Sequence, residues 1–237
     1  MGVRVHVRTR MMIKKPLRRL VESVGRRLFD IYCDPVQAMR LDALGETVAY
    51  IKANARDALC LRTRDKLFDY ALSRASGDGL VLEFGVHRGA SLRYIARRLA
   101  PRPVYGFDSF QGNPEDWSGW DAPRGVFDRQ GRRPKVPPNA HLVSGWFDDS
   151  LRAWLRDHHG EIAFVHVDCD LYSSTRCVFD HLGERIGRGT IIVFDEYFNY
   201  VNWQRHEYRA FQEFIAARGL AYRYLAYSTR QVAVEIL

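Results

Sequence analysis

The sequence predicts an α/β fold: a doubly wound, mostly parallel, seven-stranded sheet preceded by N-terminal helices. From residue 79 onward, short apolar runs alternate with helical segments, the pattern of chains that build parallel sheets. These runs are rich in β-branched and aromatic residues and end at turn residues. The last two runs are joined only by 228–230, which is too short for a parallel crossover. The final pair of strands is therefore expected to be antiparallel.

The expected strands, in chain order, cover 80–86, 104–108, 141–145, 162–168, 190–195, 221–227 and 231–237. The expected helices between them cover 90–99, about 149–158, 173–186 and about 204–218. A long irregular segment, 111–138, carries Trp117, Trp120, Phe127 and several Gly and Pro residues. We expect this segment to be a lid over a ligand site, with an ordinary surface loop as the alternative.

Three regions differ in composition: a basic N-terminal arm over 1–30, a helical extension over 31–78 and a ligand-binding domain over 79–237. The arm holds nine Arg and Lys residues against two acidic ones, whereas the rest of the chain is nearly neutral. We therefore expect no nucleic-acid partner for the main domain. Apolar residues recur at helical spacing from Leu17 to Ile31. This predicts a basic amphipathic helix that contacts an anionic surface, a partner, a neighbouring subunit or its own domain.

The composition, with 46% apolar residues, is that of a globular protein. No apolar run approaches the roughly 20 residues of a membrane span, and no secretory signal is visible. The four cysteines form no CxxC pair and no zinc-like spacing, which favours reduced thiols. A cytoplasmic protein with no transmembrane segment is the expectation.

The ends of the first two strands suggest a ligand, because open α/β sheets bind ligands at the carboxyl ends of their strands. Gly85 and Gly89 permit a tight turn before a helix, but they do not complete the dinucleotide pattern GxGxxG. Glu83 disfavours a pyrophosphate there and favours an amino-bearing ligand. Asp108 ends the second strand, where an acidic residue commonly accepts hydrogen bonds from the two hydroxyls of a ribose. The alternative is that Asp108 only stabilises a turn or caps a helix. An amino-acid end and a ribose end without phosphate match S-adenosylmethionine.

The later strands end on further polar residues. After the third strand, Gly145 and Trp146 are candidates to border an adenine, although Trp146 is as readily a core residue. The fourth and fifth strands end on Asp168 and on the adjacent pair Asp195 and Glu196. Three carboxylates at one edge of a cleft suit a hard divalent ion such as Mg²⁺. His166 and His206 are nearby candidates, but a lone histidine is more often structural.

Five stretches carry a family resemblance: VLEFGVHRGAS, VYGFDSFQGNPEDW, SGWFDDSL, VHVDCDLYSST and IIVFDEYFNY. In this order they resemble the class I S-adenosylmethionine-dependent methyltransferases, and more narrowly the macrocin O-methyltransferase family of sugar and natural-product methylating enzymes. The resemblance implies a Rossmann-like methyltransferase fold and an enzyme that methylates a hydroxyl of a small molecule, expected to be a sugar or a glycosylated natural product. Residues 1–30 match nothing in that family.

The resemblance also implies roles for individual residues. The cofactor-binding set it implies is Glu83, Phe84, Gly85, Gly89, Ser91, Asp108, Ser109, Gly145, Trp146 and Asp168. Asp168, Asp195 and Glu196 fall on the metal-binding carboxylates, for Mg²⁺ or another divalent cation, and Asp168 is the candidate catalytic base. The family often has Asp where this chain has Glu196, and glutamate is longer by one methylene. Three roles therefore stay open for Glu196: a metal ligand, a neighbour of the ligands or a base.

Two other functions remain open at this stage. The first is a metal-independent or macromolecule-directed methyltransferase that docks its acceptor through the basic arm. The second is a non-catalytic nucleotide-binding protein on the same fold, because a fold does not fix a function. Similar enzymes commonly self-associate, so a homo-oligomer is expected.

Overall fold

The computed structural model describes residues 15–75 and 77–237, and residues 1–14 of the predicted basic arm lie outside this description. The chain divides into two compact units, Met1–Asp42 and Ala43–Leu237. Helix α1 (Lys15–Tyr32) contains the helix expected from the apolar spacing. Helix α2 (Pro35–Asn54) begins in the first unit, and its last turns belong to the second. No helix among the described residues is long and apolar enough to cross a membrane.

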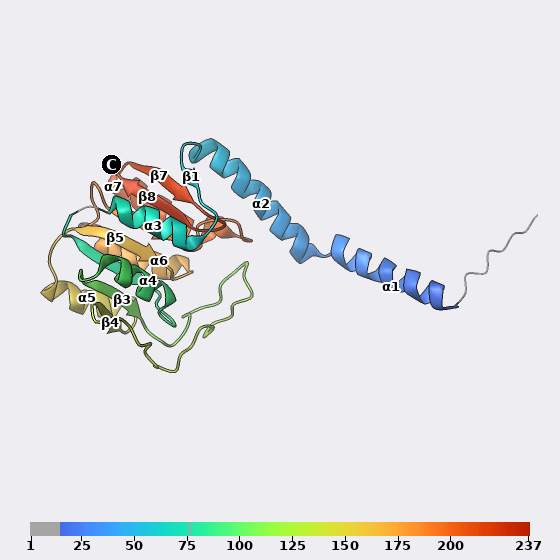
Figure 1. Cartoon of the computed structure of the whole chain (residues 1–237), viewed down its shortest axis with the longest axis horizontal. Helices are drawn as coiled ribbons and strands as arrows, with labels where there is room; N and C mark the ends of the chain where they lie inside the picture. The colour runs from blue at the N-terminus through green and yellow to red at the C-terminus, as the bar shows by residue number, and fades with distance from the viewer. Residues whose placement is uncertain (1–14, 76) are drawn as a thin grey trace, which may run out of the picture. The chain divides into compact units, whose positions relative to one another are not determined.

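The second unit contains an eight-stranded sheet with the order β1-β7-β8-β6-β5-β2-β3-β4 (Figure 1). The strands are β1 (Leu59–Cys60), β2 (Leu80–Phe84), β3 (Val104–Asp108), β4 (Ala140–Ser144), β5 (Ile162–Val167), β6 (Ile191–Phe194), β7 (Tyr222–Tyr227) and β8 (Val232–Ile236). Strands β2 to β6 pair in parallel, and β8 is antiparallel to both β6 and β7. The predicted fold class is therefore confirmed. The strand missing from the prediction is β1, a two-residue edge strand parallel to β7.

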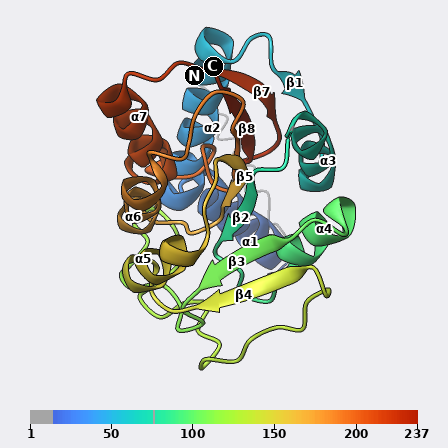
Figure 2. The same cartoon turned by 90° about the vertical axis from the view of Figure 1, so that its left-hand side faces the viewer.

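Helices cover both faces of the sheet. They are α3 (Arg64–Arg74), α4 (Ala90–Leu99), α5 (Phe147–Asp157), α6 (Tyr172–Leu182) and α7 (Glu207–Arg218), with the 3₁₀ turn η1 (Trp203–Arg205). Figure 2 shows α3 and α4 on one side of the sheet and α5, α6 and α7 on the other. This doubly wound arrangement buries the sheet on both faces, which explains why the strands are continuous apolar runs.

Two apolar cores lie on the two faces, because successive residues of a strand point to opposite sides. In β2 and β5, Val81 and Phe164 belong to the core beneath α3 and α4. Their neighbours Leu82 and Val165 belong to the core beneath α5, α6 and α7. Segment 111–138 contains no named helix or strand and has only isolated bridges, which agrees with its predicted irregularity.

Candidate active site

A cavity of about 680 Å³ lies at the carboxyl ends of the central strands. Each of five strands from β2 to β6 ends next to one of its lining residues, which are Gly85, Asp108, Gly145, Asp168 and Glu196. The others are His87, Ser109, Gly112, Asn113, Pro114, Trp117, Trp120, Phe127, Trp146, Phe147, Asp148, Cys169, Asp170, Ser173, Ser174, Cys177 and Arg230. This is the place where open parallel sheets bind their ligands.

The glycine turn after β2 lies against the end of β5. Gly85 has a φ of 91°, and a Cβ built on it would stand 1.6 Å from the carbonyl oxygen of Asp168. Only glycine permits both this backbone conformation and this approach. Gly89, with a φ of 70°, begins helix α4 and does not line the cavity. The tight turn predicted from these glycines is therefore present.

Asp108 holds that turn in place. Its Oδ2 accepts hydrogen bonds from the backbone N–H groups of Val86 (2.8 Å) and His87 (2.6 Å). Its Oδ1 accepts one of 2.6 Å from the backbone N–H of Phe110. The carboxylate also lines the cavity, where we predicted a ribose contact. Asp108 thus fixes the shape of the site, whichever ligand it meets there.

Three residues of the predicted cofactor set lie behind the cavity wall. Phe84 is fully buried and stacks on Phe107, with ring centroids 4.9 Å apart. Glu83 and Ser91 are also buried, and the Ser91 hydroxyl donates a hydrogen bond of 3.1 Å to Glu83 Oε1. The carboxylate that we expected to face a ligand on the loop is therefore engaged inside the protein. Gly85, Asp108, Ser109, Gly145, Trp146 and Asp168 of the same set line the cavity.

The partner of Glu83 is His166, which stands directly opposite it in the parallel pair β2–β5. His166 Nδ1 lies 3.0 Å from Glu83 Oε2, and His166 Nε2 lies 3.6 Å from Asp195 Oδ1. Burial alone would lower the pKa of His166, but Asp195 and Glu83 raise it to about 10. The raised pKa favours the imidazolium form of His166, which balances two buried carboxylates.

The predicted acidic centre is present but is arranged differently from the prediction. Asp168 lies with His166 and Asp195 in one group whose ligand atoms are all within 4.8 Å of one another. It lies with Asp170 and Glu196 in a second such group. Asp168 therefore belongs to both groups, one of which contains Asp195 and the other Glu196. Sequence reasoning did not include Asp170 among the ligands, although its position two residues after Asp168 could have indicated it.

Cationic side chains partly balance this centre. Arg64 Nη1 lies 3.6 Å from Asp195 Oδ1, and Arg230 Nη1 lies 3.5 Å from Glu196 Oε1. Burial would raise the pKa of Asp195, but His166 and Arg64 hold it below its usual value. Burial and the charge on Asp195 raise the pKa values of Asp168 and Glu196 well above their usual range, and burial raises that of Asp170 to about 7.

A divalent cation fits this set of donors. Among the described residues, Glu196 Oε2 is a buried oxygen without a hydrogen-bond partner, and buried Asp195 Oδ1 has no hydrogen bond beyond its 3.6 Å ion pairs with Arg64 and His166. Such atoms are costly unless something pairs with them. Carboxylate oxygens are the donors that Mg²⁺ prefers, and Asp168 and Asp170 supply more of them. The cation would also relieve the repulsion that raises the pKa values of this centre.

Glu207 is a functional residue that sequence reasoning missed. It is fully buried in the first turn of α7. Its Oε1 accepts hydrogen bonds from the backbone N–H groups of Cys169 (3.4 Å) and Asp170 (3.2 Å), and its Oε2 accepts one from Glu196 (3.2 Å). One side chain thus ties the loop after β5 to the loop after β6. Burial raises the pKa of Glu207 to about 8.

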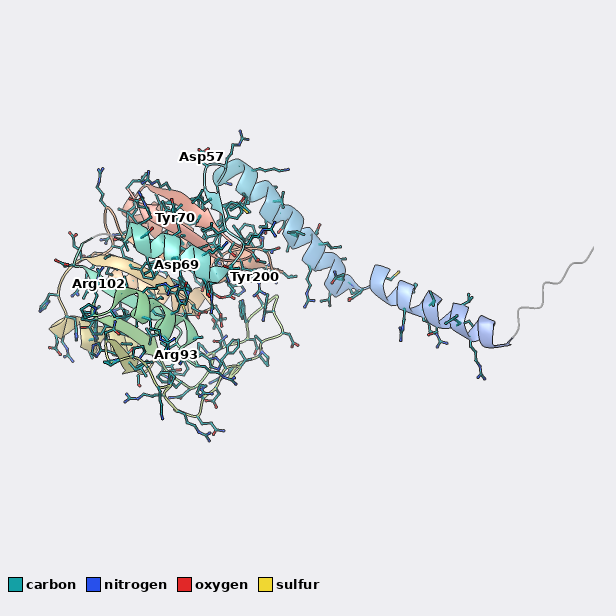
Figure 3. The ribbon with its side chains drawn as sticks, viewed as in Figure 1. Asp57, Asp69, Tyr70, Arg93, Arg102 and Tyr200 are labelled. Atoms are coloured by element: carbon teal, nitrogen blue, oxygen red, sulfur yellow. The ribbon has the colours of Figure 1, made fainter. Side chains whose placement is uncertain are left out.

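An aromatic wall, Trp117, Trp120, Phe127 and Tyr200, stands beside the acidic centre. Trp117 and Trp120 stack with centroids 5.1 Å apart, and Tyr200, labelled in Figure 3, packs edge-on against both at 5.7 Å. The Arg230 guanidinium lies 4.6 Å from the Trp120 ring centroid. Phe127 packs on His87 at 5.5 Å. Both tryptophans and Phe127 come from segment 111–138 and line the cavity.

Comparisons with known proteins agree with this geometry. A family model described as a methyltransferase domain matches residues 82–197. The 8-demethyl-8-(2,3-dimethoxy-alpha-L-rhamnosyl)-tetracenomycin-C 4'-O-methyltransferase of Streptomyces olivaceus is 26% identical over 58% of this chain and 60% of its own length. The chain thus spans less than two thirds of that relative.

Two solved structures share the fold. CalS11, a calicheamicin methyltransferase, has a TM-score of 0.60 and 19% identity, covering 99% of this chain and 98% of its own. The O-methyltransferase NovP has a TM-score of 0.52 and 22% identity, covering 72% of this chain and 76% of its own.

Residues 82–197, which carry the glycine turn and Asp108, match the methyltransferase-domain model, and the doubly wound sheet is the fold of CalS11 and NovP. The chain is thus similar to O-methyltransferases in sequence and in fold.

Proposed function

We propose that this protein transfers a methyl group from S-adenosylmethionine to a hydroxyl of a small molecule, a sugar or a glycosylated natural product, with a divalent cation at the acidic centre. The observation that carries the proposal is one cavity whose lining combines the glycine turn, Asp108 and the carboxylates of Asp168, Asp170 and Glu196, with Asp195 beside Asp168. The names of the relatives support the acceptor class. The one from Streptomyces olivaceus acts on a rhamnosyl group, and a second structure of CalS11 is described as a TDP-rhamnose 3'-O-methyltransferase.

Gly85, Asp108, Ser109, Gly145 and Trp146 would hold the methyl donor, since they line one part of the cavity. S-adenosylmethionine, when bound, supplies a methyl group already activated on a sulfonium. The remaining tasks of the protein are to align the acceptor oxygen, exclude water and accept a proton. Glu83 and Ser91 support the donor site from behind the wall through their contact with His166 and α4.

Asp168, Asp170, Asp195 and Glu196 would hold the cation, Mg²⁺ or another divalent ion. Such an ion lowers the pKa of an acceptor hydroxyl and fixes its direction. Asp168, which belongs to both groups of donor side chains and lines the cavity, would accept the hydroxyl proton. Asp170, which also lines the cavity, is a second group suited to this role.

Segment 111–138 would cover the acceptor. Its tryptophans offer flat apolar faces to a sugar ring, and Arg230 stands between that wall and the acidic centre. We also propose that the chain is divided into a basic arm over 1–30, a helical extension over 31–78 and a catalytic domain over 79–237. We further propose that the protein forms a homo-oligomer and that it is located in the cytoplasm. Light scattering on the purified chain tests the oligomeric state.

Calorimetry tests the donor site first. We expect S-adenosylmethionine to bind and NAD not to bind at the same concentration. No binding of S-adenosylmethionine at millimolar concentration would contradict the proposal. Tritiated methyl transfer to a panel of glycosides, catechols and aminoglycoside-like polyols then identifies the acceptor.

Chelation tests the cation. We expect EDTA to abolish methyl transfer and Mg²⁺ to restore it. Titration with Mn²⁺, followed by electron paramagnetic resonance, measures ion binding without turnover. The double variant Asp168→Ala/Asp195→Ala should bind no Mn²⁺ at this centre, and full activity of that variant would end the metal proposal.

A further inference from the structure

A second group of metal-ligand side chains lies away from the acidic centre, between helices α5 and α6. Asp148 is in the first turn of α5. Cys177 and His181 are four residues apart on α6, so they share one face of that helix. One ligand atom from each of the three residues lies within 4.8 Å of the others. His181 Nε2 and Asp148 Oδ1 are already 2.8 Å apart.

This group stands at the rim of the cavity. Asp148 and Cys177 both line the cavity wall, beside Trp146 and Phe147. The Asp148 side chain is 63% exposed and that of His181 is 20% exposed, so an ion could enter from solvent. Arg152 Nη2 also donates a hydrogen bond of 3.1 Å to Asp148 Oδ1. Asp148 Oδ2 has no protein partner among the described contacts and can turn toward an ion.

We propose that Asp148, Cys177 and His181 form a binding site for a thiophilic divalent cation, with Zn²⁺ as the best match. A thiolate, an imidazole and a carboxylate are the donors that proteins use for Zn²⁺, whereas Mg²⁺ prefers oxygen donors alone. Three protein ligands leave one tetrahedral position for water or for a group in the cavity. The site therefore differs in chemistry from the centre formed by Asp168, Asp170, Asp195 and Glu196.

Small side-chain movements complete the site. Donors bound to one tetrahedral Zn²⁺ lie about 3.3–3.7 Å apart, given the usual bond lengths. The His181–Asp148 contact must therefore open slightly as the ion enters between the two atoms, and the Cys177 sulfur must remain near both. Because Asp148 is exposed on the helix surface, its rotation displaces no core side chain.

Binding replaces protons that the free site holds. Burial raises the pKa of Cys177 to about 11, so the free thiol is protonated at neutral pH. The ion displaces that proton to solvent as the sulfur–metal bond forms, and the His181 nitrogen must be neutral to donate its lone pair.

Zinc binding to the purified full-length chain, in excess Mg²⁺ to occupy the acidic centre, tests the proposal. Competition with a chromophoric chelator gives the affinity, and Co²⁺ used as a substitute reports thiolate ligation through near-ultraviolet charge-transfer absorption. Removing even an outer-shell partner of a metal costs up to about a hundredfold in affinity, so Cys177→Ser and His181→Gln should each lose about a hundredfold or more. Cys33→Ser and His159→Gln, which change exposed residues elsewhere, are the matched controls.

The cobalt absorption should vanish in Cys177→Ser and persist in Cys33→Ser and in Asp168→Asn. The proposal is overturned if Cys177→Ser or His181→Gln binds Zn²⁺ as tightly as the unchanged chain, or if the cobalt absorption survives in Cys177→Ser. Thermal unfolding of each variant shows whether it is folded. If Cys177→Ser is unfolded, alkylation of the unchanged chain replaces it as the test. Zn²⁺ should then protect the Cys177 thiol from the alkylating reagent, and no protection would overturn the proposal. None of these readouts depends on methyl transfer.

Discussion

The hydroxyl of Thr47 accepts a hydrogen bond of 2.9 Å from the backbone N–H of Asn199 and donates one of 2.7 Å to the carbonyl of Ala43. Thr47 is buried in α2, and Asn199 follows Glu196 by three residues with a φ of 65°. A hydrogen bond of 2.6 Å from Gln204 to Glu46 adds a second contact between the same helix and the same loop. The last turns of α2 therefore support the loop that carries the acidic pair.

Replacing Thr47 by Val should destabilise the protein by about 1–3 kcal/mol, because the Asn199 N–H then has no acceptor. Thr47→Ser keeps the hydroxyl and should recover most of that loss. Urea unfolding measures both variants. Equal stability of the valine and serine variants would show that the hydrogen bond contributes nothing.

A cluster of buried tyrosines should make the protein sensitive to alkaline pH. The Tyr224 hydroxyl lies 2.5 Å from that of Tyr50 and 2.8 Å from that of Tyr197. Burial raises the pKa values of Tyr50 and Tyr224 above the usual 10. The unfolded chain therefore releases these protons first, so the free energy of unfolding should decrease as the pH rises above 10.

Phenolate absorbance measures this behaviour. Exposed tyrosines should titrate near pH 10, and the buried ones should ionise in a separate step that coincides with unfolding. A single smooth titration of all tyrosines below the unfolding transition would contradict the prediction. In Tyr224→Phe, the separate step should move to lower pH, because two hydroxyls lose a shared partner.

Gly85→Ala should prevent the close approach of the glycine turn to β5. The added Cβ would stand 1.6 Å from the Asp168 carbonyl oxygen, so one backbone segment must move. We expect a loss of more than about 3 kcal/mol of stability and no measurable binding of S-adenosylmethionine. Thermal unfolding and calorimetry measure the two effects.

Two further glycine variants separate the effect of the positive φ from the effect of the clash with Asp168. Gly131→Ala has a similar positive φ of 73° but meets no atom within 4 Å, so it should cost only about 1 kcal/mol. Gly187→Ala has neither problem and should be close to neutral. If Gly131→Ala were as damaging as Gly85→Ala, the clash with Asp168 would not be the cause.

His166→Gln should be strongly destabilising, since it leaves Glu83 and Asp195 without their shared cation. Removing one partner of a buried ion pair costs about 3–5 kcal/mol. The double variant Glu83→Gln/His166→Gln should lose less than the sum of the two single variants, because Glu83 is then no longer a buried charge without a partner and Asp195 keeps Arg64. Urea unfolding of the unchanged chain, the two single variants and the double variant gives a double-mutant cycle. Additive losses of stability would show that Glu83 and His166 are not coupled.

The sequence predicted the sheet well because each central strand is a short apolar run that ends on a polar residue. It missed β1, which has only two residues and therefore no detectable alternation. It predicted that Asp168, Asp195 and Glu196 would share a metal ion, and this stays a prediction. The structure groups Asp195 with His166 and Asp168, and it groups Glu196 with Asp168 and Asp170.

Other parts of the site depend on contacts that a pattern does not contain. The pairing of Glu83 with His166 follows from β2 and β5 being neighbours in the sheet although β3 and β4 lie between them in the chain. Glu207 lies eleven residues after Glu196 and reaches its loop only through the position of α7. Strand order and helix placement decide both contacts, and neither is encoded in local residue spacing.

The aromatic wall comes almost entirely from one uninterrupted stretch of chain, 111–138, whereas the opposite side of the cavity is assembled from the ends of five strands. The two sides meet at few points, such as the 3.1 Å hydrogen bond from Asn113 Nδ2 to Asp170 Oδ2. Exchanging this single stretch between related chains would therefore change the aromatic side of the cavity and keep the residues of the strand ends. If the proposed function holds, the stretch is a natural unit of recombination for changing the acceptor.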